Sequence, residues 1–150
     1  MNDISIEAQF LKYPSSMISD ALDELGINGA ISGLFPQIYN QKRISGRALP
    51  VKFKKKSLDP EAWRFGGGVG KPLEQVLKKM SSGQIVVMDL QGTVNATAWG
   101  GLASKLAQRK GVVGTIMHGT CRDLEEIREC GYPVWAIGVC PRRSRNDFTF

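Results

Sequence analysis

Two short segments hold the residues best suited to chemistry. Paired glycines, Gly100 and Gly101, stand directly before a predicted helix, and Arg122 and Asp123 follow a short apolar strand. Backbone N–H groups at a helix start favour an anion. A guanidinium matches a carboxylate, and an aspartate oxygen is a hard ligand suited to Mg²⁺ or Mn²⁺. If both segments end at the same edge of a sheet, they predict a site for a small oxo-acid and a divalent metal.

The Arg122-Asp123 pair also has a purely structural interpretation. Asp123 begins a predicted helix, where a carboxylate can cap free N–H groups, and Arg122 can form a surface ion pair. The residue types and spacing alone leave both interpretations open.

Other reactive side chains are few. The cysteines Cys121, Cys130 and Cys140 form no CxxC pair, and His118 is the single histidine, so we expect no zinc site and reduced thiols. Cys121 stands beside Arg122, yet no second histidine is available as its base. His118, at the end of a predicted strand, is either a general base or a hydrogen-bonded structural residue.

Composition is that of a globular protein. The 150 residues, 42% hydrophobic and 23% charged, predict a single domain over 1–150. No apolar run is long enough for a membrane helix, and no signal peptide is recognisable, so we expect a cytoplasmic protein. The net charge of +6 could attract nucleic acid. The lysines and arginines, however, lie at predicted strand and helix ends, where such side chains are normally solvated. Nucleic acid is therefore not expected as a partner.

Helical and strand patterns alternate along the chain. Strands are predicted at 44–53, with Pro50 indicating an edge position or bulge, and at 84–90, 112–117 and 134–139. Helices are predicted at 71–80, 101–110 and 123–130, and near the N-terminus from a Ser15-Ser16 cap to Gly26. The order predicts an α/β fold with a partly parallel sheet, and places Asp89, the loop after Gly92 and the 119–123 turn at its carboxyl edge.

Two nucleotide-type motifs are excluded. In the glycine run 66–70, a phosphate-binding loop would require glycine at Phe65 and a hydroxyl residue at Pro72. A methyltransferase is not supported, since no glycine-rich cofactor loop follows a first strand with an acidic residue downstream.

At these motifs the sequence resembles the family of regulator of ribonuclease E activity A-like proteins, which includes the 4-hydroxy-4-methyl-2-oxoglutarate aldolases. The resembling segments are 15–22, 29–34, 44–48, 85–89, 99–103 and 119–123. The resemblance implies a swivelling β/β/α domain assembled as a homotrimer or hexamer, with sites at subunit interfaces.

The resemblance also implies roles for single residues. Main-chain groups of Gly100, Gly101, Leu102 and Ala103 would bind substrate; Arg122 and Asp123 would be catalytic, Arg122 holding substrate and Asp123 holding Mg²⁺ or Mn²⁺. The implied reaction is a metal-dependent retro-aldol cleavage of a 2-oxo acid to pyruvate, with oxaloacetate decarboxylation through the same enolate. The base that takes the 4-hydroxyl proton stays open between a metal-bound water and a carboxylate of a neighbouring subunit.

The alternative is a non-catalytic, protein-binding regulator of the ribonuclease E inhibitor type. Such regulators lack the aspartate that this chain keeps as Asp123, which favours the enzyme. Gly101 and His118 depart from the acidic residues found in some relatives. The family's C-terminal strands are expected to be missing, since the sequence stops at Phe150.

Overall fold

One five-stranded sheet organises the protein. The computed structural model describes residues 5–55, 70–144 and 148–149. The strand order is β1-β6-β5-β4-β2, in which β2, β4, β5 and β6 run parallel and β1 pairs antiparallel with β6. The strands are β1 (Phe35–Pro36), β2 (Arg47–Lys52), β4 (Gln84–Trp99), β5 (Gly114–Cys121) and β6 (Val134–Val139). A separate two-stranded sheet pairs β3 (Lys54–Lys55) with β7 (Phe148–Thr149).

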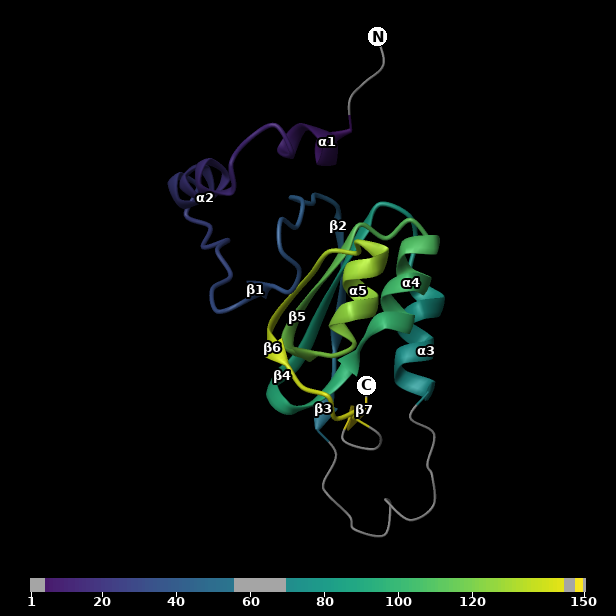
Figure 1. The fold of residues 1–150 in the computed structure, drawn as a ribbon. Coiled ribbons are helices and arrows are strands. Elements are labelled where there is room, and N and C mark those ends of the chain that lie inside the picture. Colours follow the sequence, from purple (N-terminus) through teal and green to yellow (C-terminus); the bar gives the residue numbers. More distant parts are fainter. Residues whose placement is uncertain (1–4, 56–69, 145–147, 150) are drawn as a thin grey trace.

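Three helices cover one face of the sheet. Figure 1 shows α3 (Gly70–Lys79), α4 (Gly101–Arg109) and α5 (Leu124–Cys130) on the same side, with α4 joining β4 to β5 and α5 joining β5 to β6. The core fills the space between them with buried side chains of strands and helices: Val86, Met88, Leu90, Met117, Val134, Ala136, Val76, Ala103, Ala107 and Ile127. The predicted α/β fold with a partly parallel sheet is confirmed.

An N-terminal arm precedes this body. It contains α1 (Ile6–Phe10), which the sequence patterns did not predict, and α2 (Ser15–Glu24). Neither helix has a buried residue, and Figure 1 shows both at a distance from α3, α4 and α5. None of the helices within the described ranges is long and apolar enough to span a bilayer.

Several predicted boundaries need correction. Helix α2 has Pro14, not a serine, at its N-cap, and no side chain caps it. Strand β1 lies in a stretch predicted to be loop, because Phe35 and Pro36 pair with the edge of β6. Pro50 does lie in an edge strand, β2, as predicted. The sequence pattern predicts an irregular segment at 57–70; residues 57–69 fall outside the described residues, and Gly70 is instead the first residue of helix α3.

The largest error concerns β4. It was predicted to end at Leu90 but continues to Trp99. Gln91 and Gly92 both have positive φ, at 53° and 66°, so the strand turns there without ending, and the register with β5 shifts. Asp89 and the segment after Gly92 therefore lie within the strand, and the carboxyl edge is at Trp99 instead.

The junction between β4 and α4 is held by a buried polar chain. Trp99, with 1% of its surface exposed, donates from Nε1 to Ser104 Oγ at 2.9 Å. Ser104 Oγ in turn donates to the Gly100 carbonyl at 3.0 Å. The Trp99 ring also stacks on Tyr132, with centroids 6.3 Å apart. These hydrogen bonds and the ring contact fix the position at which α4 begins.

We predict that Ser104→Ala lowers the free energy of unfolding by about 1–3 kcal/mol, because the buried Trp99 N–H then has no acceptor. Urea denaturation followed by circular dichroism measures the change. Ser32→Ala, at an exposed position, is the control and should change stability by no more than about 0.5 kcal/mol. Equal stability of the two variants would contradict the role given to Ser104.

Candidate functional site

The two predicted segments meet because two parallel strands end side by side. Trp99, the last residue of β4, is in register with Cys121, the last of β5. The backbone N–H of Arg122 donates to the Trp99 carbonyl at 3.1 Å. Gly100, which follows β4, and Arg122 and Asp123, which follow β5, are thereby brought to the same edge of the sheet, as the sequence predicted.

Asp123 does not cap its own helix. It occupies the N-cap position of α5 with a left-handed backbone (φ 55°, ψ 49°), and its side chain makes no capping hydrogen bond. The carboxylate lies beside α4 instead: Oδ2 accepts from the Gly101 N–H at 3.3 Å and is 3.3 Å from Arg122 Nε. The prediction that Asp123 caps its own helix is thus wrong, whereas the prediction that Arg122 forms an ion pair is confirmed.

Both glycines are needed for this close approach. A Cβ on Gly100 would lie 2.4 Å from Asp123 Oδ2 and 3.0 Å from Arg122 Cγ. A Cβ on Gly101 would lie 2.3 Å from Glu126 Oε2. A larger residue at Gly100 would require the side chains of Asp123 and Arg122 to shift, and one at Gly101 would require Glu126 to move from its Cβ outward.

The next two predicted residues form the first turn of α4. Leu102 has an exposed side chain and Ala103 a buried one. The first N–H groups of a helix have no acceptor within it and carry the positive end of its dipole. Their backbone groups are therefore free in principle to bind an anion beside Arg122, and their assigned role as main-chain binders stays a prediction.

Two other candidates lie elsewhere or are inert. His118 pairs with Asp89 across β4 and β5, Nδ1 to Oδ1 at 3.2 Å, three positions before the strand end. The Gln91 N–H and then His118 lower the pKa of Asp89. Cys121 is fully buried, which raises its thiol pKa to about 11, so it stays protonated and is no nucleophile near neutral pH.

Sequence reasoning missed Lys105 and Glu126. Glu126 Oε2 lies against Gly101 and 3.2 Å from Lys105 Nζ. Both residues were detectable by helical spacing, because Glu126 is three residues after Asp123 and Lys105 four after Gly101. What the sequence does not show is that the two helices face each other across a glycine.

The residues fit one kind of metal site. No group of three or more His, Cys, Asp or Glu suited to a metal occurs in the part of the chain that the structure describes. Asp123 offers a single carboxylate that is one-third exposed. Mg²⁺ is commonly held by one or two carboxylates together with waters and substrate oxygens, so Asp123 fits such a cation.

The sheet is covered by helices on one face, and the candidate site lies where two neighbouring parallel strands end. The protein is therefore an α/β protein with a candidate site at the edge of its sheet. The sequence matches the RraA-like family, described as Aldolase/RraA, over residues 15–149, and the chain belongs to this family. The resemblance seen in the motifs is thus confirmed.

Individual relatives carry several names. The chain is 31% identical over 125 residues to the 4-hydroxy-4-methyl-2-oxoglutarate aldolase of Thermus thermophilus, covering 78% of this chain and 70% of that protein. It is 30% identical over 139 residues to protein DlpA of Legionella pneumophila, covering 91% of this chain but 21% of DlpA. It spans 50% of a third relative, from Methanocaldococcus jannaschii.

Solved structures share the fold. RraAS2 of Streptomyces coelicolor, described as an unusual member of the RNase ES inhibitor RraA protein family, superposes with a TM-score of 0.82. The sequence identity is 23%, over 99% of this chain and 71% of that chain. At this identity the likeness concerns the fold alone.

We predict that Gly100→Ala displaces the Asp123 carboxylate, because its Cβ would overlap Oδ2. Overpacking of this kind costs about 1–3 kcal/mol of folding stability. Thermal unfolding measures that cost, and a crystal structure of the variant shows the displacement. Gly138→Ala is the matched control, since a Cβ there meets nothing within 4 Å; an unmoved Asp123 in Gly100→Ala would refute the argument.

Proposed function

We propose that the chain is a divalent-metal-dependent lyase that cleaves 2-oxo acids of the 4-hydroxy-4-methyl-2-oxoglutarate type and releases pyruvate. One observation carries this proposal: Asp123 turns away from its own helix toward the Gly101 N–H and Arg122. This puts a carboxylate, a guanidinium and a helix start together. The name of the Thermus relative supports the same activity.

Substrate binding is assigned to Arg122 and the first turn of α4. The planar guanidinium can take two oxygens of the carboxylate next to the 2-oxo group. The N–H groups of Leu102 and Ala103, in the first turn of α4, would add two donors with the dipole of that helix behind them. These contacts orient the substrate so that its oxo group lies beside Asp123.

The proposed reaction is a retro-aldol cleavage. The 4-hydroxyl group gives its proton to a base, either a water or a carboxylate of a neighbouring subunit, the C3–C4 bond breaks, and the electron pair of that bond passes to the pyruvate portion as an enolate. A proton added at C3 completes pyruvate, and the other fragment leaves as a second 2-oxo acid. Arg122 would stabilise the negative charge that develops and lower the pKa of a water that returns the proton. Oxaloacetate would form the same enolate by losing carbon dioxide.

Asp123 is the residue that would hold a divalent cation, Mg²⁺ or Mn²⁺, and such a cation would supply a Lewis acid for the 2-oxo group. The remaining oxygen of Asp123, Oδ1, lies on a carboxylate that is one-third exposed, which leaves room for water and substrate ligands.

We also propose that several copies assemble, as a homotrimer or hexamer. The support is the N-terminal arm, whose helices α1 and α2 bury no residue although they carry large apolar side chains, among them Ile6, Phe10, Met17 and Leu25. Exposed apolar surface of this kind marks association sites. A second copy would cover it.

The three free cysteines fit a reducing compartment such as the cytoplasm.

We predict that the protein with Mg²⁺ or Mn²⁺ releases pyruvate from 4-hydroxy-4-methyl-2-oxoglutarate and from oxaloacetate. Asp123→Asn should lower kcat/KM by about a hundredfold or more, because the metal-holding charge is lost. Asparagine tolerates the left-handed backbone, so folding is preserved. Coupled lactate dehydrogenase measures the pyruvate.

Chelation provides the control. EDTA should abolish the activity of the unchanged protein, and added Mg²⁺ should restore it. Activity that survives both EDTA and Asp123→Asn would refute the metal mechanism. A well-folded protein with no activity on either substrate would favour the regulator alternative.

We predict an oligomer in solution, with a mass three or six times that of the 16.5 kDa chain. Light scattering after size-exclusion chromatography measures it. Removing residues 1–26 should shift the mass downward, since the arm supplies the apolar contacts. A monomeric chain of residues 1–150 would contradict the proposed assembly.

A further inference from the structure

The Lys105–Glu126 ion pair lies beside the candidate site and is not among the groups assigned there to substrate or metal. Lys105 Nζ is 3.2 Å from Glu126 Oε2. Lys105 is four residues after Gly101 on α4, and helical side chains point back toward the helix N-terminus. Its ammonium therefore lies toward the end of α4 at which the site is built.

Glu126 connects this pair to Asp123 through the glycine. Its Oε2 occupies the space next to Gly101, within 2.3 Å of where a Cβ would stand. The N–H of the same glycine donates to Asp123 Oδ2 at 3.3 Å. A continuous series of contacts therefore links the two ion pairs. Its members, in order, are Arg122, Asp123, Gly101, Glu126 and Lys105, and the side chain at each end is positively charged.

The pair is open to exchange. Its side chains are 43% and 49% exposed, and an ion pair at such exposure contributes no more than about 1 kcal/mol.

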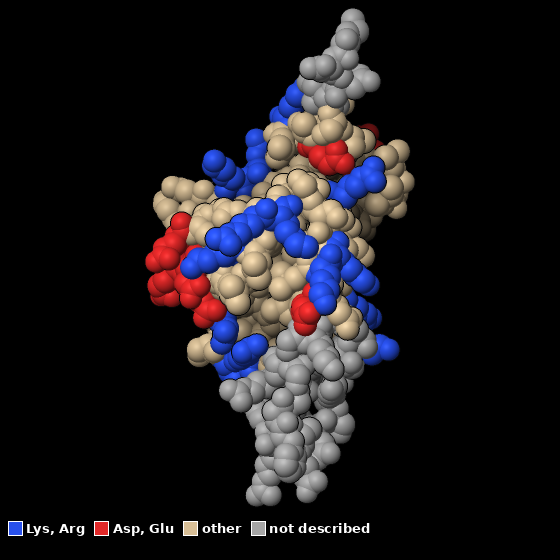
Figure 2. Space-filling model, turned by 90° about the vertical axis from the view of Figure 1, so that its right-hand side faces the viewer, with Lys and Arg blue, Asp and Glu red and all other residues tan. Residues whose placement is uncertain are grey.

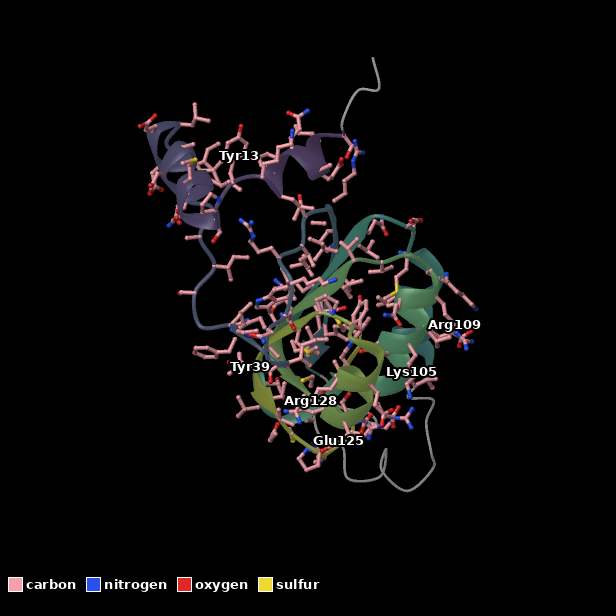
Figure 3. The ribbon with its side chains drawn as sticks, turned by 45° about the horizontal axis from the view of Figure 1, so that its top comes forward. Tyr13, Tyr39, Lys105, Arg109, Glu125 and Arg128 are labelled. Atoms are coloured by element: carbon pink, nitrogen blue, oxygen red, sulfur yellow. The ribbon has the colours of Figure 1, made fainter. Side chains whose placement is uncertain are left out.

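Figure 3 labels Lys105 on α4 between Arg109, one turn further along, and Glu125 at the start of α5. Figure 2 shows the side covered by helices, where Lys and Arg side chains run up to a group of Asp and Glu side chains.

We propose, on the basis of the proposed function, that Lys105 binds the distal carboxylate of a dicarboxylic 2-oxo acid and that Glu126 holds Lys105 in place until substrate arrives. Such a substrate carries two carboxylates, and Arg122 with the first turn of α4 serves the one beside the oxo group. An ammonium has three N–H donors, so Lys105 can take a substrate carboxylate once its exposed contact with Glu126 opens. The site then selects dicarboxylic over monocarboxylic 2-oxo acids.

A pair of matched ligands tests this selectivity. 2-Oxoglutarate and 2-oxopentanoate both have five carbons and differ by the distal carboxylate. Calorimetry in the presence of MgCl₂ measures their dissociation constants directly, and their inhibition of pyruvate release gives a second value. We expect 2-oxoglutarate to bind more tightly to the unchanged protein.

Lys105→Met keeps an unbranched side chain that is one atom shorter and removes its charge. It should lower the preference for 2-oxoglutarate by about tenfold, the usual effect of losing one charged hydrogen bond, and leave 2-oxopentanoate binding unchanged. Arg109→Met removes a charge one turn further along α4 and is the control that should keep the preference. Glu126→Gln should raise the preference, because it removes a carboxylate that competes for Lys105.

The outcomes separate this inference from the proposed function. If the unchanged protein does not bind 2-oxoglutarate, or if Lys105→Met leaves the preference intact, the role of Lys105 is refuted even where pyruvate is released. If ligand preference behaves as expected but no pyruvate is released from either substrate, the binding role stands and the lyase proposal fails.

Discussion

The close packing of the Gly100–Gly101 backbone against side chains of the segment 122–126 is the constraint on which the candidate site depends. The register of β4 with β5 brings Trp99 and Cys121 level, so the chain segments that follow must share one small space. At Gly100 the backbone is extended (φ −163°), a conformation open to any residue. Glycine is required there for room: the atoms that a Cβ would meet belong to Asp123 and Arg122.

This packing gathers charge that must be balanced. Two carboxylates, of Asp123 and Glu126, lie against the start of α4, where the helix dipole favours negative charge. Arg122 and Lys105 each pair with one of them. Both ion pairs are partly exposed, so each contributes little to stability and can open at little cost when a ligand arrives. The core that supports them is rigid by contrast, because Trp99 is locked to Ser104 and stacked on Tyr132.

The sequence allowed the meeting of the two segments to be predicted because that meeting follows from alternation alone: each strand leads into a helix, and parallel strands end at one edge. It did not allow the length of β4 to be predicted, since Gln91-Gly92 has the composition of a turn, and only pairing with β5 shows that the strand continues. Glu126 was missed for a related reason. Its contact with Gly101 crosses between two helices and depends on how α4 and α5 pack, which no local pattern encodes.

The backbone of Asp123 bears on the choice between an enzyme and a binding module. A left-handed conformation at a residue other than glycine costs free energy, on the order of 1 kcal/mol or more. A capping hydrogen bond would repay that cost within α5, but Asp123 makes none. The side chain is held instead by the Gly101 N–H and by Arg122, outside its own helix. What the conformation does provide is a carboxylate aimed at a helix start and at Arg122, an arrangement that a cation and an oxo-acid can use and that a flat protein-binding surface does not require.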